Sequence, residues 1–221
     1  MGIGLLFEDA TKNAVKRAVA DVEKVTSAEV VVAVAPTSGF YRHADYVGGM
    51  AIAAFMLAVF LYYPEPFDWT YLPLELGVGF ALGAVLVRNV DAVRRALSGR
   101  RLLDENVRRA ARERFVDLGV SKTSARTGIL VFVSAFERRV EIVTDTGVDA
   151  AALGSAWSDA VKKLDRSLRL DADPGRFVEA LRALGAPLGA VLPRAAGDVN
   201  ELADDVHDPS DDDGDEEGGA S

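Results

Sequence analysis

Two long stretches without charge constrain this chain more than any other feature of its sequence. Residues 47–63 are seventeen residues without a charged side chain, and residues 72–87 are sixteen residues that include only Glu75. As α-helices they would measure roughly 24 to 26 Å, less than the roughly 30 Å hydrocarbon core of a bilayer, so interfacial residues would complete each crossing. We expect a two-helix transmembrane hairpin over residues 44–90. The alternative is a helical hairpin buried in a soluble core.

The residues that flank these stretches suit a membrane–water interface and predict an orientation. Aromatic side chains, which favour the headgroup layer, precede the first stretch and surround the connection at residues 64–71. The connection holds two acids and no base, whereas arginines lie before the first stretch and after the second (Arg42, Arg88, Arg94, Arg95, Arg100 and Arg101). The positive-inside rule therefore predicts a multi-pass protein of the cell (inner) membrane, with the N-terminus, the folded domain and the C-terminus in the cytoplasm.

The rest of the chain alternates between helices and strongly apolar strands. Residues 29–35 and 129–134 are almost continuously apolar, which is typical of strands covered on both faces. Residues 139–144 alternate between apolar and charged side chains and predict a strand that forms a hairpin with the second. Helical periodicity appears in four segments, at residues 8–24, 104–118, 157–168 and 177–188. These elements predict an α/β fold, a small α/β/α sandwich.

This domain organisation is discontinuous, because the membrane hairpin falls between the first two strands. We expect one α/β domain built from residues 5–40 and 100–193, interrupted by the hairpin with its helices at 47–63 and 72–87. Residues 194–221 form a C-terminal extension that we expect to be acidic and disordered from about residue 204, since its composition is poor in apolar side chains.

Charge and composition exclude several classes of function. The formal charge is −9, but residues 208–221 hold seven of the 34 acids and no base, so the remaining chain has 27 acids and 25 bases. Because no basic face for a phosphate backbone is predicted, we expect no nucleic-acid partner. The absence of cysteine excludes disulfides and thiolate sites, and two histidines argue against a histidine triad or a multi-histidine metal site.

Several motifs of the predicted domain resemble the TPM domain family, whose best known members are thylakoid-lumen proteins linked to photosystem II repair. They are Thr26-Ser27-Ala28-Glu29, Phe115-Val116-Asp117-Leu118-Gly119, Arg126-Thr127-Gly128 with the strand that follows, and the segment from Glu137 to Gly147. The chain is similar to a bacterial branch that carries two membrane helices at this place and ends in a segment like Gly197-Asp198-Val199-Asn200-Glu201-Leu202. The resemblance implies a small α/β/α sandwich. It also implies either an accessory role on a membrane complex or, as described for some relatives, acid phosphatase activity or calcium binding.

The candidate site residues follow from both arguments. Asp145 and Asp149 stand just past a strand end, where α/β proteins often place functional groups, and with Glu29 they could begin a ligand set for Ca²⁺ or another divalent cation. The alternative is that Asp145 stabilises a turn and Asp149 caps a helix. Thr127, Gly128 and Gly147 are further family-like positions.

One departure from the family pattern bears on activity. The family pattern before the second strand resembles Asp-Asn-Gly, and the resemblance makes its Asp the candidate for metal or phosphate chemistry. Here the matching stretch is Arg126-Thr127-Gly128. An arginine can hold a phosphate but cannot ligate a metal, which argues against hydrolysis through a cation.

Together these features predict a membrane-anchored TPM-domain protein with a cytoplasm-facing domain and an accessory or interaction role. Its partners would be the lipid bilayer and another membrane protein or complex. The alternatives are a divalent-cation-dependent phosphatase centred on Asp145 and a calcium-binding regulatory module.

Overall fold

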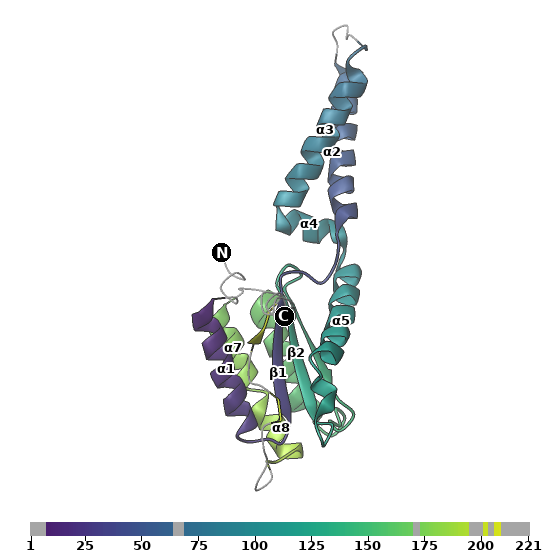
Figure 1. The fold of residues 1–221 in the computed structure, drawn as a ribbon. Helices are drawn as coiled ribbons and strands as arrows, with labels where there is room; N and C mark the ends of the chain where they lie inside the picture. The colour runs from purple at the N-terminus through teal and green to yellow at the C-terminus, as the bar shows by residue number, and fades with distance from the viewer. Residues whose placement is uncertain (1–7, 64–68, 170–172, 195–200, 203–205, 209–221) are drawn as a thin grey trace, which may run out of the picture. The chain divides into compact units, whose positions relative to one another are not determined.

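The computed structural model describes residues 8–63, 69–169, 173–194, 201–202 and 206–208 (Figure 1). Contacts divide the chain into two compact units, one of Met1–Ser38 with Asn106–Ser221 and one of Gly39–Glu105. Each unit is described by itself below. Most of the predicted acidic extension, including the family-like ending at 197–200, lies outside the described residues.

A four-stranded mixed sheet forms the centre of the first unit. Its order is β3-β2-β1-β4, with β1 (Glu29–Ala35), β2 (Gly128–Ser134), β3 (Arg139–Thr144) and β4 (Val206–His207). β1 and β2 are parallel and in register from Glu29 beside Gly128 to Ala35 beside Ser134, and β3 is antiparallel to β2. The prediction of an α/β fold and of the β2–β3 hairpin is confirmed. β4 pairs in parallel with β1 in a segment where the composition predicted disorder.

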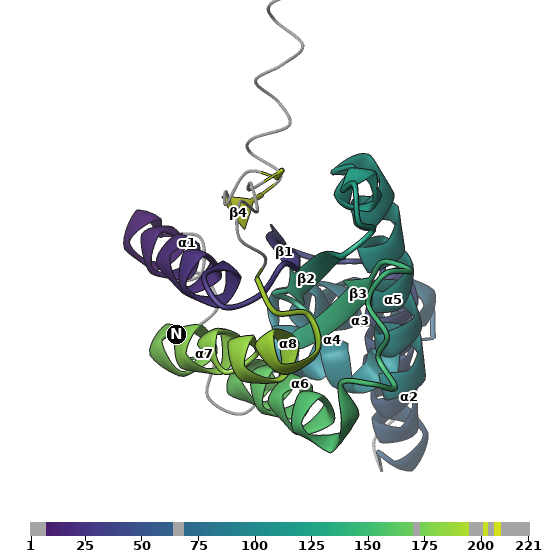
Figure 2. The same ribbon diagram turned by 90° about the horizontal axis from the view of Figure 1, so that it is seen from below.

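Helices cover both faces of this sheet because both central strands are apolar on both faces. One face, with Val32 and Val131, packs against helices α1 (Asp9–Glu23), α6 (Gly154–Arg169), α7 (Pro174–Arg182) and α8 (Gly185–Val191). The other face, with Leu130 and Phe132, packs against α5 (Arg100–Asp117) through Val107, Ala111 and Phe115. Figure 2 shows the sheet between these two helical layers. Each core residue is at most 9% exposed.

The helix boundaries differ from the sequence prediction at two places. The helix expected at 177–188 is two helices, α7 and α8, because Pro187 has no N–H to donate to the carbonyl of residue 183 and its ring would clash there. The helix expected at 104–118 begins at Arg100, and a separate short helix, α4 (Asp91–Ser98), precedes it. Gly99 lies between α4 and α5 with a φ of 75°, a left-handed value that glycine adopts at little cost.

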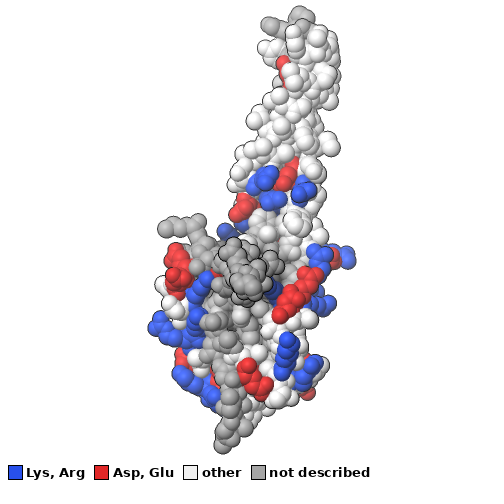
Figure 3. Space-filling view, in the orientation of Figure 1, with Lys and Arg blue, Asp and Glu red and all other residues white. Residues whose placement is uncertain are grey.

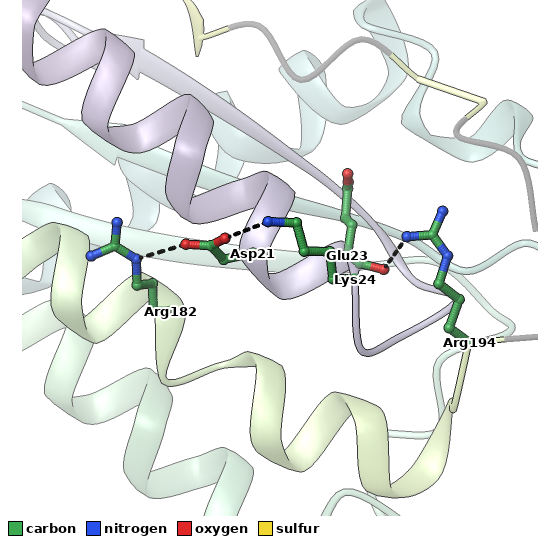
Figure 4. A network of polar contacts seen from close by, with 5 residues as sticks. All are labelled: Asp21, Glu23, Lys24, Arg182 and Arg194. Atoms are coloured by element: carbon green, nitrogen blue, oxygen red, sulfur yellow. Dashed lines mark hydrogen bonds and ion pairs between the residues drawn. The ribbon is translucent and has the colours of Figure 1, made fainter.

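An exposed ion-pair network joins α1 to α7 in the first unit. The Asp21 carboxylate accepts hydrogen bonds from Lys24 Nζ at 2.8 Å and from Arg182 Nε at 3.2 Å, and an Arg194 nitrogen donates to the Glu23 carbonyl at 3.1 Å (Figure 4). The pKa of Asp21 is lowered from its ordinary value, chiefly because Lys24 donates a hydrogen bond to the charged carboxylate and adds its positive charge, with Arg182 acting in the same direction.

The second unit contains two long antiparallel helices, α2 (Arg42–Tyr62) and α3 (Leu72–Asn89). Both are long and apolar enough to cross a membrane, and only 17% of the most apolar part of each helix is buried within the structure. In the view of Figure 3 their surface is almost free of charge, and charged side chains gather at the α4 end.

Glycines allow α2 and α3 to approach each other closely. Gly48, Gly49, Gly79 and Gly83 are the buried glycines of the pair, and a Cβ added at Gly83 would lie 2.6 Å from the Gly48 carbonyl oxygen. That neighbour is backbone, so a side chain at this position cannot be accommodated by a rotamer change. Small residues at a helix interface are the usual means by which helices pack closely within a membrane.

We therefore expect Gly83→Ala to separate α2 from α3 and to lower the stability of the hairpin by about 1 to 3 kcal/mol, the usual range for overpacking. Gly77→Ala is the matched control, since it lies in the same helix and a Cβ there meets nothing within 4 Å. Thermal melting of the full chain in a mild detergent, followed by circular dichroism, measures both. Equal melting temperatures for the two variants would contradict this account of the interface.

The Asp21 network predicts a pH dependence of stability. Because the folded-state pKa of Asp21 lies below its ordinary value of 3.8, its contribution is present at neutral pH and is lost as the pH falls through the lowered folded-state value. We expect Asp21→Asn to melt below the wild type at neutral pH and the difference to disappear in acid. The control is Glu113→Gln, because the Glu113 carboxylate is 4.0 Å from Arg109 Nε, the limit of an ion pair. This substitution should leave the melting temperature close to that of the wild type at both pH values. A difference that persists in acid would show that charge is not the cause.

Candidate functional site

The family-like positions meet at one end of the sheet. Glu29 lies beside Gly128 in the β1–β2 register, and the Asp145 N–H donates to the Gly128 carbonyl at 2.9 Å. Asp145 follows β3, but β3 is antiparallel, so this is the end at which β1 and β2 begin. Ligand sites of parallel sheets usually lie at the opposite, carboxyl end of the strands. Asp145 therefore does not lie at the end of the sheet where α/β proteins usually place functional groups.

The Asp145 carboxylate is buried and its oxygens face groups of the same chain. Its Oδ1 accepts the Thr146 N–H at 2.7 Å. Its Oδ2 lies 3.1 Å from Arg126 Nε, close enough for an ion pair although the two groups are not aligned as a hydrogen bond. The carboxylate side chain is 3% exposed, whereas the Arg126 side chain is 53% exposed. A guanidinium therefore covers this carboxylate from the solvent side.

The backbone around Arg126 holds the guanidinium in this place. Arg126 has a φ of 58°, in the left-handed region that non-glycine residues rarely adopt. Its N–H donates to the Thr123 carbonyl at 3.1 Å, its carbonyl accepts the Gly147 N–H at 2.8 Å, and its side chain donates to the Ser121 carbonyl at 3.0 Å. The turn before β2 and the turn after β3 are thus one hydrogen-bonded structure.

Thr127, Gly128 and Gly147 have structural roles in these same turns. The Thr127 hydroxyl donates to the Ser27 carbonyl at 3.1 Å, which joins the turn to the start of β1. A Cβ at Gly147 would lie 2.4 Å from the Ala125 carbonyl oxygen, and a Cβ at Gly128 would lie 2.1 Å from the Val120 carbonyl oxygen. Close backbone approach therefore explains why these positions are glycine.

Asp149 and Glu29 do not complete a ligand set with Asp145. Asp149 is exposed and accepts the N–H groups of Ala151 and Ala152 at 2.9 and 3.3 Å, in a turn that precedes α6. Among the residues that the structure describes, no three His, Cys, Asp or Glu side chains are grouped so that they could hold a metal ion. The residues present do not fit the divalent cation that the resemblance implies, because the Arg126 guanidinium already neutralises the buried Asp145 carboxylate.

A second polar cluster, which the sequence analysis missed, lies at the carboxyl ends of β1 and β2. The Glu137 carboxylate is buried and accepts the Ser38 N–H at 2.8 Å and the Ser134 hydroxyl. The Ser38 and Ser134 hydroxyl oxygens are 2.6 Å apart. A signal was present in the sequence, since Ser134 ends an apolar strand and Glu137 follows it within the hairpin connection. The residues come together only because β1 and β2 end in register.

This cluster stabilises the chain and does not present a reactive group. Ser134 is 0% exposed and Glu137 is 3% exposed, so neither side chain can meet a substrate in this conformation. Ser38 is the last residue of the first segment of this unit, Met1–Ser38. Its hydrogen bond to Glu137 joins that segment to the β2–β3 hairpin. It therefore fixes the place at which the chain leaves the first unit towards residues 39–105.

Comparison with known proteins supports the fold alone. No family model matches the chain, and no curated protein sequence matches it. One similar solved structure is the NMR structure of the BA42 protein from the psychrophilic bacterium Bizionia argentinensis, with 15% sequence identity and a TM-score of 0.54. The similarity covers 91% of this chain and 94% of that one. At this identity it carries no statement about activity.

The Arg126–Asp145 pair gives a prediction about stability. We expect Asp145→Ala and Arg126→Asn each to lower the free energy of unfolding by about 1 to 3 kcal/mol, because each leaves charged or polar groups without their partner. Asparagine tolerates the left-handed backbone, so Arg126→Asn removes the charge without adding strain. The double variant should lose less than the sum, since the two residues interact. Asp159→Ala, at a side chain 76% exposed, is the control.

The same variants separate this structural role from catalysis. We expect hydrolysis of p-nitrophenyl phosphate, with Ca²⁺ or Mg²⁺, to stay at background in the wild type and in Asp145→Ala. Metal-dependent hydrolysis that disappears in Asp145→Ala while the melting temperature is unchanged would contradict the structural role and favour the phosphatase.

Proposed function

We propose that this chain is a membrane-anchored protein of the TPM domain family, with two transmembrane helices and an α/β domain that faces the cytoplasm. Its function is an accessory one, in which the α/β domain binds another membrane protein or complex. The observation that carries the proposal is the large apolar surface that α2 and α3 leave exposed. Large side chains along α2 such as Met50, Phe55 and Leu61 are each more than 60% exposed, as are Leu74 and Leu82 on α3.

The exposure of these side chains favours a lipid environment over water. A helix pair in the core of a soluble protein would be mostly buried, whereas only 17% of the most apolar part of each helix is buried here. Each large apolar side chain left in water forgoes about 1.5 to 3 kcal/mol of burial free energy, and soluble monomers rarely expose an apolar patch of this extent. Lipid tails would cover this surface, and the buried glycines would hold the two helices together inside it.

The charge distribution supports the orientation. The side of the hairpin that carries α4 and the start of α5 holds Arg88, Arg94, Arg95, Arg100 and Arg101, while the connection between α2 and α3 has acids and no base. Basic residues near short loops stay on the cytoplasmic side. The chain ends and the α/β domain would then lie in the cytoplasm.

An accessory role fits the polar groups of the α/β domain better than a catalytic one. At one end of the sheet, Asp145 is covered by Arg126, and at the other end Glu137 is held by Ser38 and Ser134. The polar groups of both clusters bind one another and thereby stabilise the turns at the two ends of the sheet. Thr127, Gly128 and Gly147, which belong to the motifs that carry the TPM resemblance, have roles in the turns of this chain.

Cysteine labelling in intact cells tests this proposal, because the chain has no cysteine of its own. We expect Thr70→Cys, in the connection between α2 and α3, to react with a membrane-impermeant maleimide. Arg109→Cys, at a side chain 67% exposed on α5, should react only after the cells are opened. The opposite pattern would reverse the orientation. Reaction of both variants in intact cells, or of neither, together with recovery of the protein in the soluble fraction, would contradict membrane insertion.

A further inference from the structure

Helix α4 is an amphipathic segment that the proposed membrane anchor does not by itself explain. It begins directly after α3, where Val90 departs from helical geometry with φ −115° and ψ 87°. It then turns back so that it contacts both α2 and α3. Arg94 on α4 forms an ion pair with Asp45 near the start of α2, with 3.1 Å between Arg94 Nε and Asp45 Oδ1. The helix is thus held at one end of the hairpin.

The two faces of α4 are arranged opposite to those of a helix packed on a soluble core. Its polar side is the inner one, since Ser98 is buried with its hydroxyl donating to the Arg94 carbonyl at 2.7 Å, and Arg94 is half-buried. Its apolar side is the outer one. Within α4, Val93 and Leu97 follow at i and i+4 on one face and are 42% and 38% exposed, and Val90, the residue before the helix, is 37% exposed. An apolar stripe that faces outward requires an apolar environment outside the unit.

The charges beside this stripe identify that environment. Residues 88–101 contain Arg88, Arg94, Arg95, Arg100 and Arg101 and one acid, Asp91. A short helix with an apolar face flanked by arginines is the pattern of a segment that lies in the plane of a membrane surface, with its apolar face at the acyl boundary. Arg94 pairs with Asp45 and Arg101 pairs with Glu105. The phosphates of anionic lipids complement Arg88 and Arg100, and the stripe follows α3 directly in the chain.

We propose that α4 lies in the headgroup layer of the cytoplasmic leaflet and binds anionic lipids. Val90, Val93 and Leu97 would enter the acyl boundary, and Arg88 and Arg100 would contact lipid phosphates. This inference rests on the proposed membrane anchor and adds to it a lipid preference. Because Gly99 alone separates α4 from α5, binding of α4 to the surface also fixes the point at which the chain leaves the membrane.

A fluorescent label sensitive to polarity tests the position of α4. The full chain, labelled at Leu97→Cys, is reconstituted into vesicles of phosphatidylcholine alone or with phosphatidylglycerol. We expect a blue-shifted emission that is stronger with phosphatidylglycerol and is quenched by a lipid that carries its quencher near the headgroup. Asp159→Cys, at a side chain 76% exposed in the first unit, is the aqueous control. Leu82→Cys, at a side chain 64% exposed on α3, reports insertion of the hairpin.

The Leu82 label separates failure of this inference from failure of the proposed anchor. An aqueous Leu82 label would overturn the membrane anchor itself. An apolar Leu82 label with an aqueous Leu97 label in both lipid mixtures would overturn the inference about α4 alone. A Leu97 label that is apolar to the same degree in both mixtures would show no preference for anionic lipid, which also overturns the inference.

Removal of charge tests the lipid preference. We expect Arg88→Gln and Arg100→Gln each to lower the ratio of surface-bound to unbound α4 by about fivefold in vesicles with phosphatidylglycerol, since each basic residue near an anionic surface contributes a factor of this size. The double variant, Arg88→Gln with Arg100→Gln, should combine the two losses. Raised salt should have the same effect by screening. Arg17→Gln with Arg112→Gln, at exposed positions of the first unit, removes equal charge and should leave the Leu97 label unchanged. An equal response to both pairs of substitutions would overturn a local lipid contact.

Discussion

The burial of β1 and β2 on both faces is the constraint on which the rest of the α/β unit depends. Because successive residues of these parallel strands are apolar and point to opposite faces of the sheet, helices must cover each face. Parallel neighbours also require a crossover, and residues 36–127 provide it, with α5 as the helix that returns to the sheet. A crossover of this length leaves room for a second compact unit, residues 39–105, without change to the strand register.

The register of these two strands also decides where polar groups meet. Both strands begin together and end together, from Glu29 beside Gly128 to Ala35 beside Ser134, so each end of the sheet collects the residues of its adjoining turns. At one end Arg126 pairs with Asp145, and at the other Glu137 binds Ser38 and Ser134. Buried carboxylates are stable only with such partners, and here the partners come from the chain itself. This arrangement is the reason that an accessory role is the better proposal.

The hairpin unit follows a different rule. Its helices are held by close backbone contact at Gly48 and Gly83 and by an ion pair at one end, between Asp45 and Arg94. Its large apolar side chains are turned outward, including those of α4. Close packing of small residues with apolar side chains outside is the arrangement that a lipid solvent favours, since lipid supplies no hydrophobic force between helices. The proposals of a membrane anchor and of a lipid-binding α4 both derive from this outward orientation of the large apolar side chains.

The sequence by itself determined the elements that depend on local pattern. Continuous apolar runs predicted β1 and β2, alternation predicted β3, and periodicity predicted the helices of both layers, because strand and helix place side chains at different periods. It did not predict the division between α7 and α8 or the separate helix α4. The first break falls at residues 183–184, before Pro187, and the second at Val90, where the backbone leaves helical geometry.

The candidate site was decided by the tertiary structure. Asp145, Thr127, Gly128 and Gly147 could be selected from the sequence, but their roles could not, because the direction of β3 places Asp145 at the amino end of the parallel strands. The left-handed Arg126 brings its guanidinium to that carboxylate, and this contact depends on hydrogen bonds between two turns far apart in the chain. Glu137 and Ser38 likewise meet only across the sheet. Local pattern determines which elements form, whereas long-range register determines which charges are neighbours.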